Sequence, residues 1–173
     1  DSMSTDRIIG MIQPKRMGEL KKPDLFDVGC LCKIVSFNET DDGRYIILIK
    51  GINRFKKVKE IENKKLYREL FVDYNLYKND EKLNNENFEF SKIKQILDEL
   101  KILFDKRGYQ INWKDLNGQN VYQTLSALSM ASPFSILEKQ ILLETKNIED
   151  TKNKFEEILK TYNSEFSNLK TIQ

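Results

Sequence analysis

Between residues 7 and 74 lie several apolar stretches rich in strand-forming residues, and those at 28–36 and 54–61 alternate between apolar and polar positions with a period close to two, which is typical of β-strands. The apolar stretches run over residues 7–12, 28–37, 44–50, 54–61 and 66–74. The polar segment at residues 38–43 combines side chains that bond their own backbone with a glycine that tolerates positive φ. Gly51 interrupts the next apolar run. The pattern therefore predicts an antiparallel meander with one partly buried face.

After residue 88 the apolar period changes to that of an α-helix. Apolar stripes predict helices over residues 90–107, 121–130, 133–142 and 148–169, with a short helical turn at Trp113. We expect Gly108 to end the first of these helices and Ser132 to cap the helix that begins at Pro133.

The change of period predicts an α+β protein of two subdomains. The expected boundaries are a β-rich subdomain at 1–77, a linker at 78–87 and a helical subdomain at 88–173. The linker segment is rich in Asn, Asp, Glu and Lys and poor in apolar residues, as connections between subdomains are. A chain of 173 residues is long enough to bury a hydrophobic core.

The charge and cysteine content limit the possible binding partners and the cellular compartment of the protein. Lys and Arg number 29 against 27 Asp and Glu, so no global field favours nucleic acid or an acidic membrane. No apolar run approaches the ~18 residues that a membrane span needs, and no signal peptide is visible. Cys30 and Cys32 lie two apart on one predicted strand, where a disulfide between them is geometrically poor. We expect both to be core thiols in a reducing, cytoplasmic protein.

The residues needed for most catalytic and metal sites are missing from the sequence. It contains no histidine, and Cys30 and Cys32 lack the further ligands of a zinc site. No G-x-x-x-x-G-K-[ST] phosphate loop and no G-x-S-x-G nucleophile elbow occur. Asp41 and Asp42 precede Gly43 and are interpreted as turn residues. We therefore predict no catalytic residue, no metal and no cofactor.

Several short motifs follow one another along nearly the whole chain. They are DRIIGMIQP at 6–14, VGC at 28–30, YRE at 67–69, VDY at 72–74, RG at 107–108, INW at 111–113, ASPF at 131–134, EKQ at 138–140 and LLE at 142–144. Between the second and third lies a structural motif made of Asp41, Asp42, Gly43, Arg44, Tyr45, Gly51, Arg54 and Phe55. In combination these motifs resemble the LON N-terminal domain family, which is found at the amino end of Lon proteases and as free-standing small bacterial proteins.

The resemblance implies a PUA-like, mainly antiparallel β pseudo-barrel followed by a helical bundle. It implies a non-catalytic module that recognises unfolded or apolar segments of proteins in protein quality control, with protein substrates and a Lon-type ATP-dependent protease as partners. The family usually begins with an apolar strand and a Pro-containing loop ahead of the segment at Asp6 and Arg7. Neither is present, so we expect an incomplete amino terminus.

The loop between residues 15 and 27 supplies the candidate polypeptide-binding residues, Met17, Leu20, Leu25 and Phe26. Methionine and aromatic side chains in a connection can form an adaptable surface for apolar partners. They can equally fold back and cover the sheet, since exposed apolar patches are uncommon. The resemblance favours the binding interpretation, and both remain open.

Two other functions also remain open. A nucleic-acid-binding module would use Arg54, Lys56, Lys57 and Lys59, although acidic residues at 60, 62, 69 and 73 oppose that field. A small-molecule site between sheet and helices would need several aromatic residues as its lining. Trp113 is the only tryptophan in the sequence, and one residue does not form such a lining.

Overall fold

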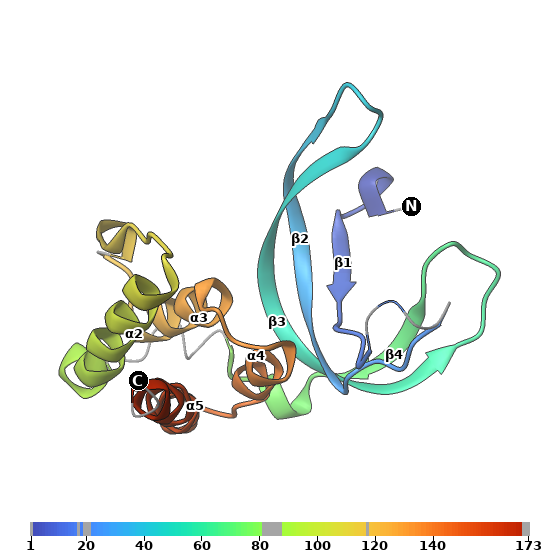
Figure 1. Cartoon of the computed structure of the whole chain (residues 1–173). Helices are drawn as coiled ribbons and strands as arrows, with labels where there is room; N and C mark the ends of the chain where they lie inside the picture. The colour runs from blue at the N-terminus through green and yellow to red at the C-terminus, as the bar shows by residue number, and fades with distance from the viewer. Residues whose placement is uncertain (1, 17, 19–21, 81–87, 117, 171–173) are drawn as a thin grey trace. The chain divides into compact units, whose positions relative to one another are not determined.

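Figure 1 shows the computed structural model of the chain, which describes residues 2–16, 18, 22–80, 88–116 and 118–170. Contacts within the chain divide it into two compact units, Asp1–Asp80 and Glu81–Gln173. The first, here called the sheet unit, holds all the described strands, and the second, the helical unit, holds the described α-helices. The protein is therefore of the α+β class.

The sheet unit contains four antiparallel strands in the order β1-β2-β3-β4. They are β1 (Ile8–Met11), β2 (Val28–Glu39), β3 (Tyr45–Ile61) and β4 (Glu69–Asp73). Short 3-10 helices stand before β1 at Ser2–Ser4 and after β4 at Asn75–Tyr77. Sequential strands are neighbours throughout, which confirms the predicted meander.

The single long strand β3 replaces the two strands expected on either side of Gly51. Gly51 pairs with Cys32, while the next residue of β2 towards its start, Leu31, pairs with Asn53. Ile52 is therefore an extra residue in β3. Such a bulge bends a strand and increases its twist without reversing its direction, so the interruption that the sequence suggested is a bend within one strand.

The core of the sheet unit depends on a close approach between Phe55 and Gly29. These two residues are partners across β2 and β3, and Phe55 is fully buried. A Cβ atom on Gly29 would lie 2.6 Å from the Phe55 ring and 2.6 Å from the carbonyl oxygen of Met11. Only glycine leaves room for the ring here. The other buried apolar residues of the unit are Leu25, Val28, Cys32, Ile34 and Tyr77.

Cys30 and Cys32 are both free thiols in the sheet unit. Burial raises the pKa of the Cys32 thiol to about 12 and also raises the pKa of Cys30. Both thiols therefore stay protonated near neutral pH and react slowly. Among the described residues, no group of three or more potential metal-ligating side chains comes together, and no helix is long and apolar enough to cross a membrane.

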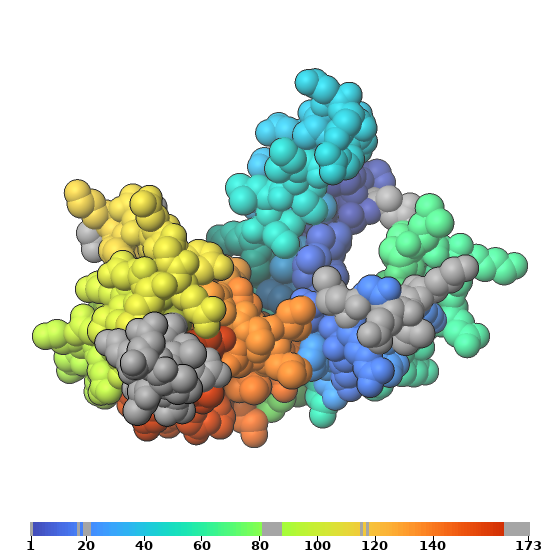
Figure 2. All heavy atoms as spheres, viewed as in Figure 1, coloured from blue at the N-terminus to red at the C-terminus, as the bar shows by residue number. Residues whose placement is uncertain are grey.

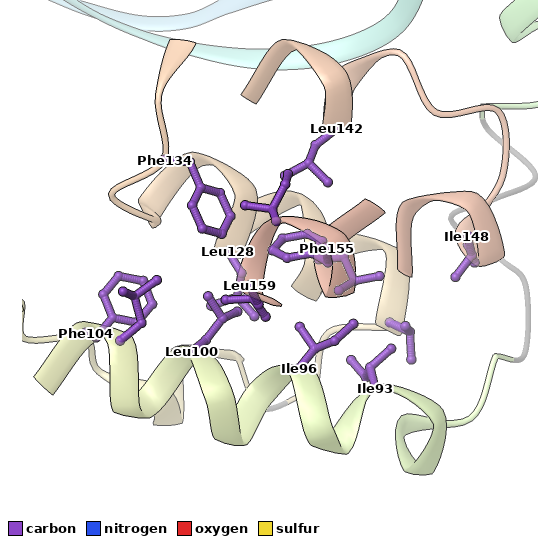
Figure 3. Close-up of a cluster of buried hydrophobic side chains, with 14 residues drawn as sticks. Ile93, Ile96, Leu100, Phe104, Leu128, Phe134, Leu142, Ile148, Phe155 and Leu159 are labelled. Atoms are coloured by element: carbon purple, nitrogen blue, oxygen red, sulfur yellow. The ribbon is translucent and has the colours of Figure 1, made fainter. Parts of the chain in front are cut away.

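The helical unit is built on one apolar cluster, drawn in Figure 3. Its α-helices are α2 (Lys94–Arg107), α3 (Val121–Ala131), α4 (Ile136–Leu143) and α5 (Ile148–Lys170). The 3-10 helices η3 (Phe90–Ile93) and η4 (Trp113–Leu116) stand before and after α2. Gly108, at φ 72°, ends α2 as predicted. The side chains labelled in Figure 3 are Ile93, Ile96, Leu100, Phe104, Leu128, Phe134, Leu142, Ile148, Phe155 and Leu159.

The predicted cap at Ser132 is wrong by three residues. The N-cap of α4 is Ser135, whose Oγ accepts from the backbone N–H of Glu138 while the Glu138 carboxylate accepts from the backbone N–H of Ser135. Ser132 instead ends α3, and its hydroxyl donates to the carbonyl of Leu128 at 2.6 Å. Pro133 therefore lies in the connection between the helices and not in the first turn of α4.

Candidate polypeptide-binding surface

The turn between β2 and β3 has the chemistry that its sequence predicted. The Thr40 N–H donates to the Arg44 carbonyl at 2.8 Å, and Gly43, at φ 76°, donates to the Thr40 carbonyl at 2.9 Å. Asp42 accepts from the Arg44 guanidinium and the Thr40 hydroxyl, and these bonds lower the pKa of its carboxyl to about 2. Asp41 and Asp42 are turn residues, as expected.

The part of this hairpin that extends past the residues paired with β1 carries apolar side chains on both faces. Residues opposite each other across antiparallel strands share a face, so Phe37 and its partner Ile47 lie on one face with Tyr45. The Phe37 and Tyr45 rings are 6.4 Å apart. Ile46 and Leu48 point to the other face and are 66% and 61% exposed. We call these five residues the hairpin surface. Figure 2 shows the tip of the hairpin projecting from the sheet unit, while the Arg7 guanidinium lies 6.0 Å from the centre of the Phe37 ring.

The outer backbone edges beside the hairpin surface have no strand partner within the described part of the sheet unit. β4 pairs with β3 only between Lys56 and Ile61, and β1 pairs with β2 only between Cys30 and Lys33. Among the described residues no strand pairs with the outer edge of β3 before Lys56 or of β2 beyond Ile34. An open edge presents unpaired N–H and C=O groups, to which an extended peptide can add as a further strand.

The base of the hairpin is held by a buried ion pair that the sequence did not reveal. Arg54 donates to the Asp80 carboxylate from its backbone N–H and Nε at 3.0 Å and from Nη2 at 2.7 Å. The Arg54 guanidinium also lies 4.2 Å from the centre of the Tyr77 ring. Arg54 and Asp80 are 6% and 5% exposed. Of the linker predicted at 78–87, residues 81–87 lie outside the described residues, and Asp80 belongs to the sheet unit.

The predicted binding residues of the loop are only partly described. Met17 and Leu20 lie outside the described residues. Leu25 is buried and forms an isolated β-bridge with Pro14, and Phe26 is half-buried, with its N–H donating to the carbonyl of Gln13 at 2.9 Å. Their role in binding stays a prediction. An extended apolar surface of the described sheet unit comes instead from the hairpin between β2 and β3, whose sequence predicts strands and a turn but no binding site.

An ion cluster fixes the end of that loop. Glu60 pairs with Arg68 at 2.6 Å and with Lys22 at 2.9 Å, and Arg68 also donates to the Pro23 carbonyl at 2.7 Å. The Arg68 guanidinium, followed by the Lys22 ammonium, lowers the pKa of the Glu60 carboxyl to about 2. The described end of the loop is thereby tied to β3 and to the segment before β4.

The basic residues considered for nucleic-acid binding are not all available to contact a phosphate backbone. The Arg54 side chain is buried against Asp80. Lys57 donates to the Leu25 carbonyl at 2.9 Å and pairs with Asp27 at 3.3 Å. The Lys59 ammonium lies 4.8 Å from the centre of the Phe71 ring. Three of the four basic side chains are thus engaged within the sheet unit, which weakens a phosphate-binding role for this segment.

A small α+β domain with a two-faced apolar hairpin and no assembled metal cluster among its described residues has the features of a binding domain. Residues 1–161 match the sequence profile of the ATP-dependent protease La (LON) substrate-binding domain. The chain belongs to this family. The family is described as the substrate-binding domain of an ATP-dependent protease.

The chain is similar to one protease sequence and to two solved structures. The chain is 31% identical over 140 residues to Lon protease of Malacoplasma penetrans, a match that covers 73% of the chain and 17% of that protein. The chain therefore corresponds to about a sixth of the length of this relative. Two solved structures are similar at a TM-score of 0.49 and 14% identity. They are the N-terminal domain of Mycobacterium avium complex Lon protease, with 88% of this chain and 89% of that one covered, and a Lon N-terminal domain protein from Xanthomonas campestris, with 89% of both covered.

Proposed function

We propose that this chain is a polypeptide-recognition module that binds unfolded or apolar segments of other proteins and carries out no chemistry itself. The observation that supports this function most directly is the hairpin surface, with apolar side chains on both faces next to open backbone edges. A strand with apolar residues on both faces is typical of a position buried on both sides. An extended apolar polypeptide could pair its backbone with the unpaired edge of this strand and cover the apolar side chains on one face of the hairpin.

The partners of this module would be protein substrates, together with a Lon-type protease that degrades them. Membership of the family supports this context. The two free thiols, Cys30 and Cys32, suit a reducing compartment such as the cytoplasm.

The direct test is fluorescence anisotropy with a labelled, permanently unfolded polypeptide. The double variant Ile46→Thr/Leu48→Thr removes apolar area from one face of the hairpin while keeping residues that favour strands. Covering such a side chain stabilises a complex by ~1.5–3 kcal/mol when burial is complete. Because burial in a complex is partial, we expect the affinity to fall by about tenfold for each side chain.

Val58→Thr is the matched control. Val58 is 63% exposed on the same strand, β3, but lies near its other end. The control should bind like the unaltered chain, and affinity should change little with salt because the contacts are apolar. An unchanged affinity in the double variant would refute the proposed surface. Salt-sensitive binding of single-stranded RNA with no binding of unfolded protein would refute the proposed function.

A further inference from the structure

Two lysines lie directly opposite each other across β2 and β3, beside the hairpin surface. Lys33 of β2 is the register partner of Lys50 of β3, so both side chains project from the same face of the sheet. Both are exposed. Like charges directly opposite each other across two strands destabilise a sheet. We call these two residues the lysine pair; nothing in the proposed function uses them.

The charge of the lysine pair is not compensated within the described part of the chain. Neither ammonium forms a salt bridge or a hydrogen bond with a described residue. The Asp6 carboxylate, close in sequence to the β1 partner of Lys33, accepts from the backbone N–H of Ile8 at 3.1 Å. Asp42, in the turn of the hairpin, accepts from the Arg44 guanidinium at 2.7 Å. These two carboxylates are thus engaged with their own neighbours.

The lysine pair shares its face with exposed apolar side chains. Residues two apart on a strand project from one face, and β3 has no extra residue between Ile46 and Lys50. Ile46, Leu48 and Lys50 therefore form one row along β3. Their partners on β2 are Asn38, Ser36 and Lys33. This stretch of the face therefore carries two positive charges and no negative one.

Protection of a sheet edge accounts for only one of the two lysines. Lysines on edge strands discourage pairing with other chains, and Lys50 lies where the outer edge of β3 has no strand partner among the described residues. Lys33 lies on β2, which is paired with β1 on one side and β3 on the other at this position. A second cation opposite the first instead suits a ligand with a negative charge.

We propose that the polypeptides bound by this module carry an acidic residue, which lies beside the lysine pair when the polypeptide pairs with the outer edge of β3. This inference rests on the proposed function and adds a charge preference to it. All pairings in the sheet unit are antiparallel, and antiparallel pairs are slightly the more stable. The added strand then runs opposite to β3, with its acidic residue opposite Lys50 and apolar residues two and four positions later opposite Leu48 and Ile46.

The apolar row favours a polypeptide over a nucleic acid as the acidic ligand. A phosphate backbone is also attracted to lysines. Nucleic acid binds through charge along its length and through stacking of bases on aromatic rings. Ile46 and Leu48, next to the lysine pair, are aliphatic and provide neither. An extended segment of the pattern acidic-x-apolar-x-apolar matches both parts of this face.

The test is fluorescence anisotropy with three labelled peptides, built around Glu-Thr-Ile-Thr-Leu, Gln-Thr-Ile-Thr-Leu and the reversed order Leu-Thr-Ile-Thr-Glu. We expect the Glu peptide to bind about two- to fivefold more tightly than the Gln peptide, the usual gain from an opposite-charge pair across strands. The reversed peptide has the same composition, but antiparallel pairing places its glutamate opposite Ile46, so it should bind no more tightly than the Gln peptide. High salt should remove the preference by screening exposed charges and leave the affinity for the Gln peptide unchanged.

Lys33→Gln/Lys50→Gln should abolish the preference and leave the affinity for the Gln peptide unchanged. Its urea midpoint should stay the same or rise, because the variant removes two like charges that face each other. Lys56→Gln/Lys64→Gln is the matched control, since it removes two exposed lysines of the same unit, one in β3 outside the unpaired edge and one between β3 and β4. It should keep the preference for the Glu peptide.

Several results would overturn the inference. They are equal affinities for the Glu and Gln peptides, a reversed peptide that binds as tightly as the Glu peptide, or a preference that survives in Lys33→Gln/Lys50→Gln. Salt-sensitive binding of single-stranded RNA that this variant abolishes, without any preference among the peptides, would assign the lysine pair to phosphate and overturn it as well.

The acidic preference and the proposed function can fail separately. If the peptides show no preference while Ile46→Thr/Leu48→Thr weakens the binding of unfolded protein, the acidic preference is refuted and the proposed function stands. If the chain binds neither the peptides nor unfolded protein, both are refuted. Binding of the Glu peptide by a chain that ignores unfolded protein would refute the proposed function, and with it the inference.

Discussion

Replacing Asp80 by asparagine tests how strongly one buried ion pair holds the sheet unit together. The Asp80 carboxylate accepts three hydrogen bonds from Arg54, at 3.0, 3.0 and 2.7 Å. Asparagine has a similar shape and keeps one acceptor oxygen but carries no charge. The guanidinium would then remain in a buried position without its counter-ion, and removing one partner of such a pair costs about 3–5 kcal/mol.

The environment of Arg54 places the expected loss at the lower end of that range. The Tyr77 ring, 4.2 Å from the guanidinium, stays in place in the variant and continues to stabilise the cation. We therefore expect the free energy of unfolding of the sheet unit to fall by about 3 kcal/mol. With urea slopes of ~1–3 kcal/mol per molar, the midpoint would move by roughly 1–3 M.

Urea unfolding followed by the amide NMR signals of β2 and β3 measures this loss directly. The fluorescence of Trp113 follows the helical unit in the same samples and shows whether the loss is confined to the sheet unit. The double variant Arg54→Met/Asp80→Asn removes the buried charge while position 80 can still accept from the backbone N–H of residue 54, so it should recover most of the stability. A loss below about 1 kcal/mol in Asp80→Asn, or a double variant less stable than the single one, would show that the pair is not desolvated as the structure indicates.

The remaining predictions concern packing and pH. Gly29→Ala should lower the free energy of unfolding by about 1–3 kcal/mol, because its Cβ would clash with the Phe55 ring and a backbone oxygen; Gly10→Ala, whose Cβ would lie 3.6 Å from the same ring, is the control and should change it little. Equal losses in urea unfolding would contradict this packing. Arg68 lowers the pKa of the Glu60 carboxyl from 4.5 to about 2. The ionised Glu60 therefore stabilises the folded chain at pH values above its unfolded-state pKa near 4.5, and this stabilisation disappears as the pH falls towards 2. Urea midpoints of the unaltered chain and Glu60→Gln should therefore differ at pH 7 and converge in acid; a difference that grows on acidification would have the wrong sign.

Local chemistry made the turn and the helix end predictable. The side chains at residues 38–43 and the glycine at 43 determine the turn almost by themselves, and Gly108 ends α2 for the same local reason. Ser132 and Ser135 illustrate the limit of such signals. Both are serines near the start of α4, and the choice between them depends on which has a glutamate three residues later to complete the capping box.

The sequence patterns do not predict contacts between residues that are far apart in the chain. Asp80 lies 26 residues after Arg54, in a polar segment whose composition suggests a linker. The bulge at Ile52 depends on how β2 and β3 align, so Gly51 alone could not distinguish a bend from a strand end. The apolar residues of the hairpin surface predict a strand equally well whether they are buried or exposed, so their pattern alone does not indicate a binding surface.

The open edge of β3 has a further consequence for how the chain behaves at high concentration. An apolar strand with unpaired backbone groups is a template for any extended strand, including the same strand of a second copy. Self-association would occupy the same edge that a bound polypeptide needs, so occupancy by the polypeptide would fall as the concentration of the chain rises. Ile46→Thr/Leu48→Thr should then improve solubility as it weakens binding, because aggregation and recognition draw on one set of side chains.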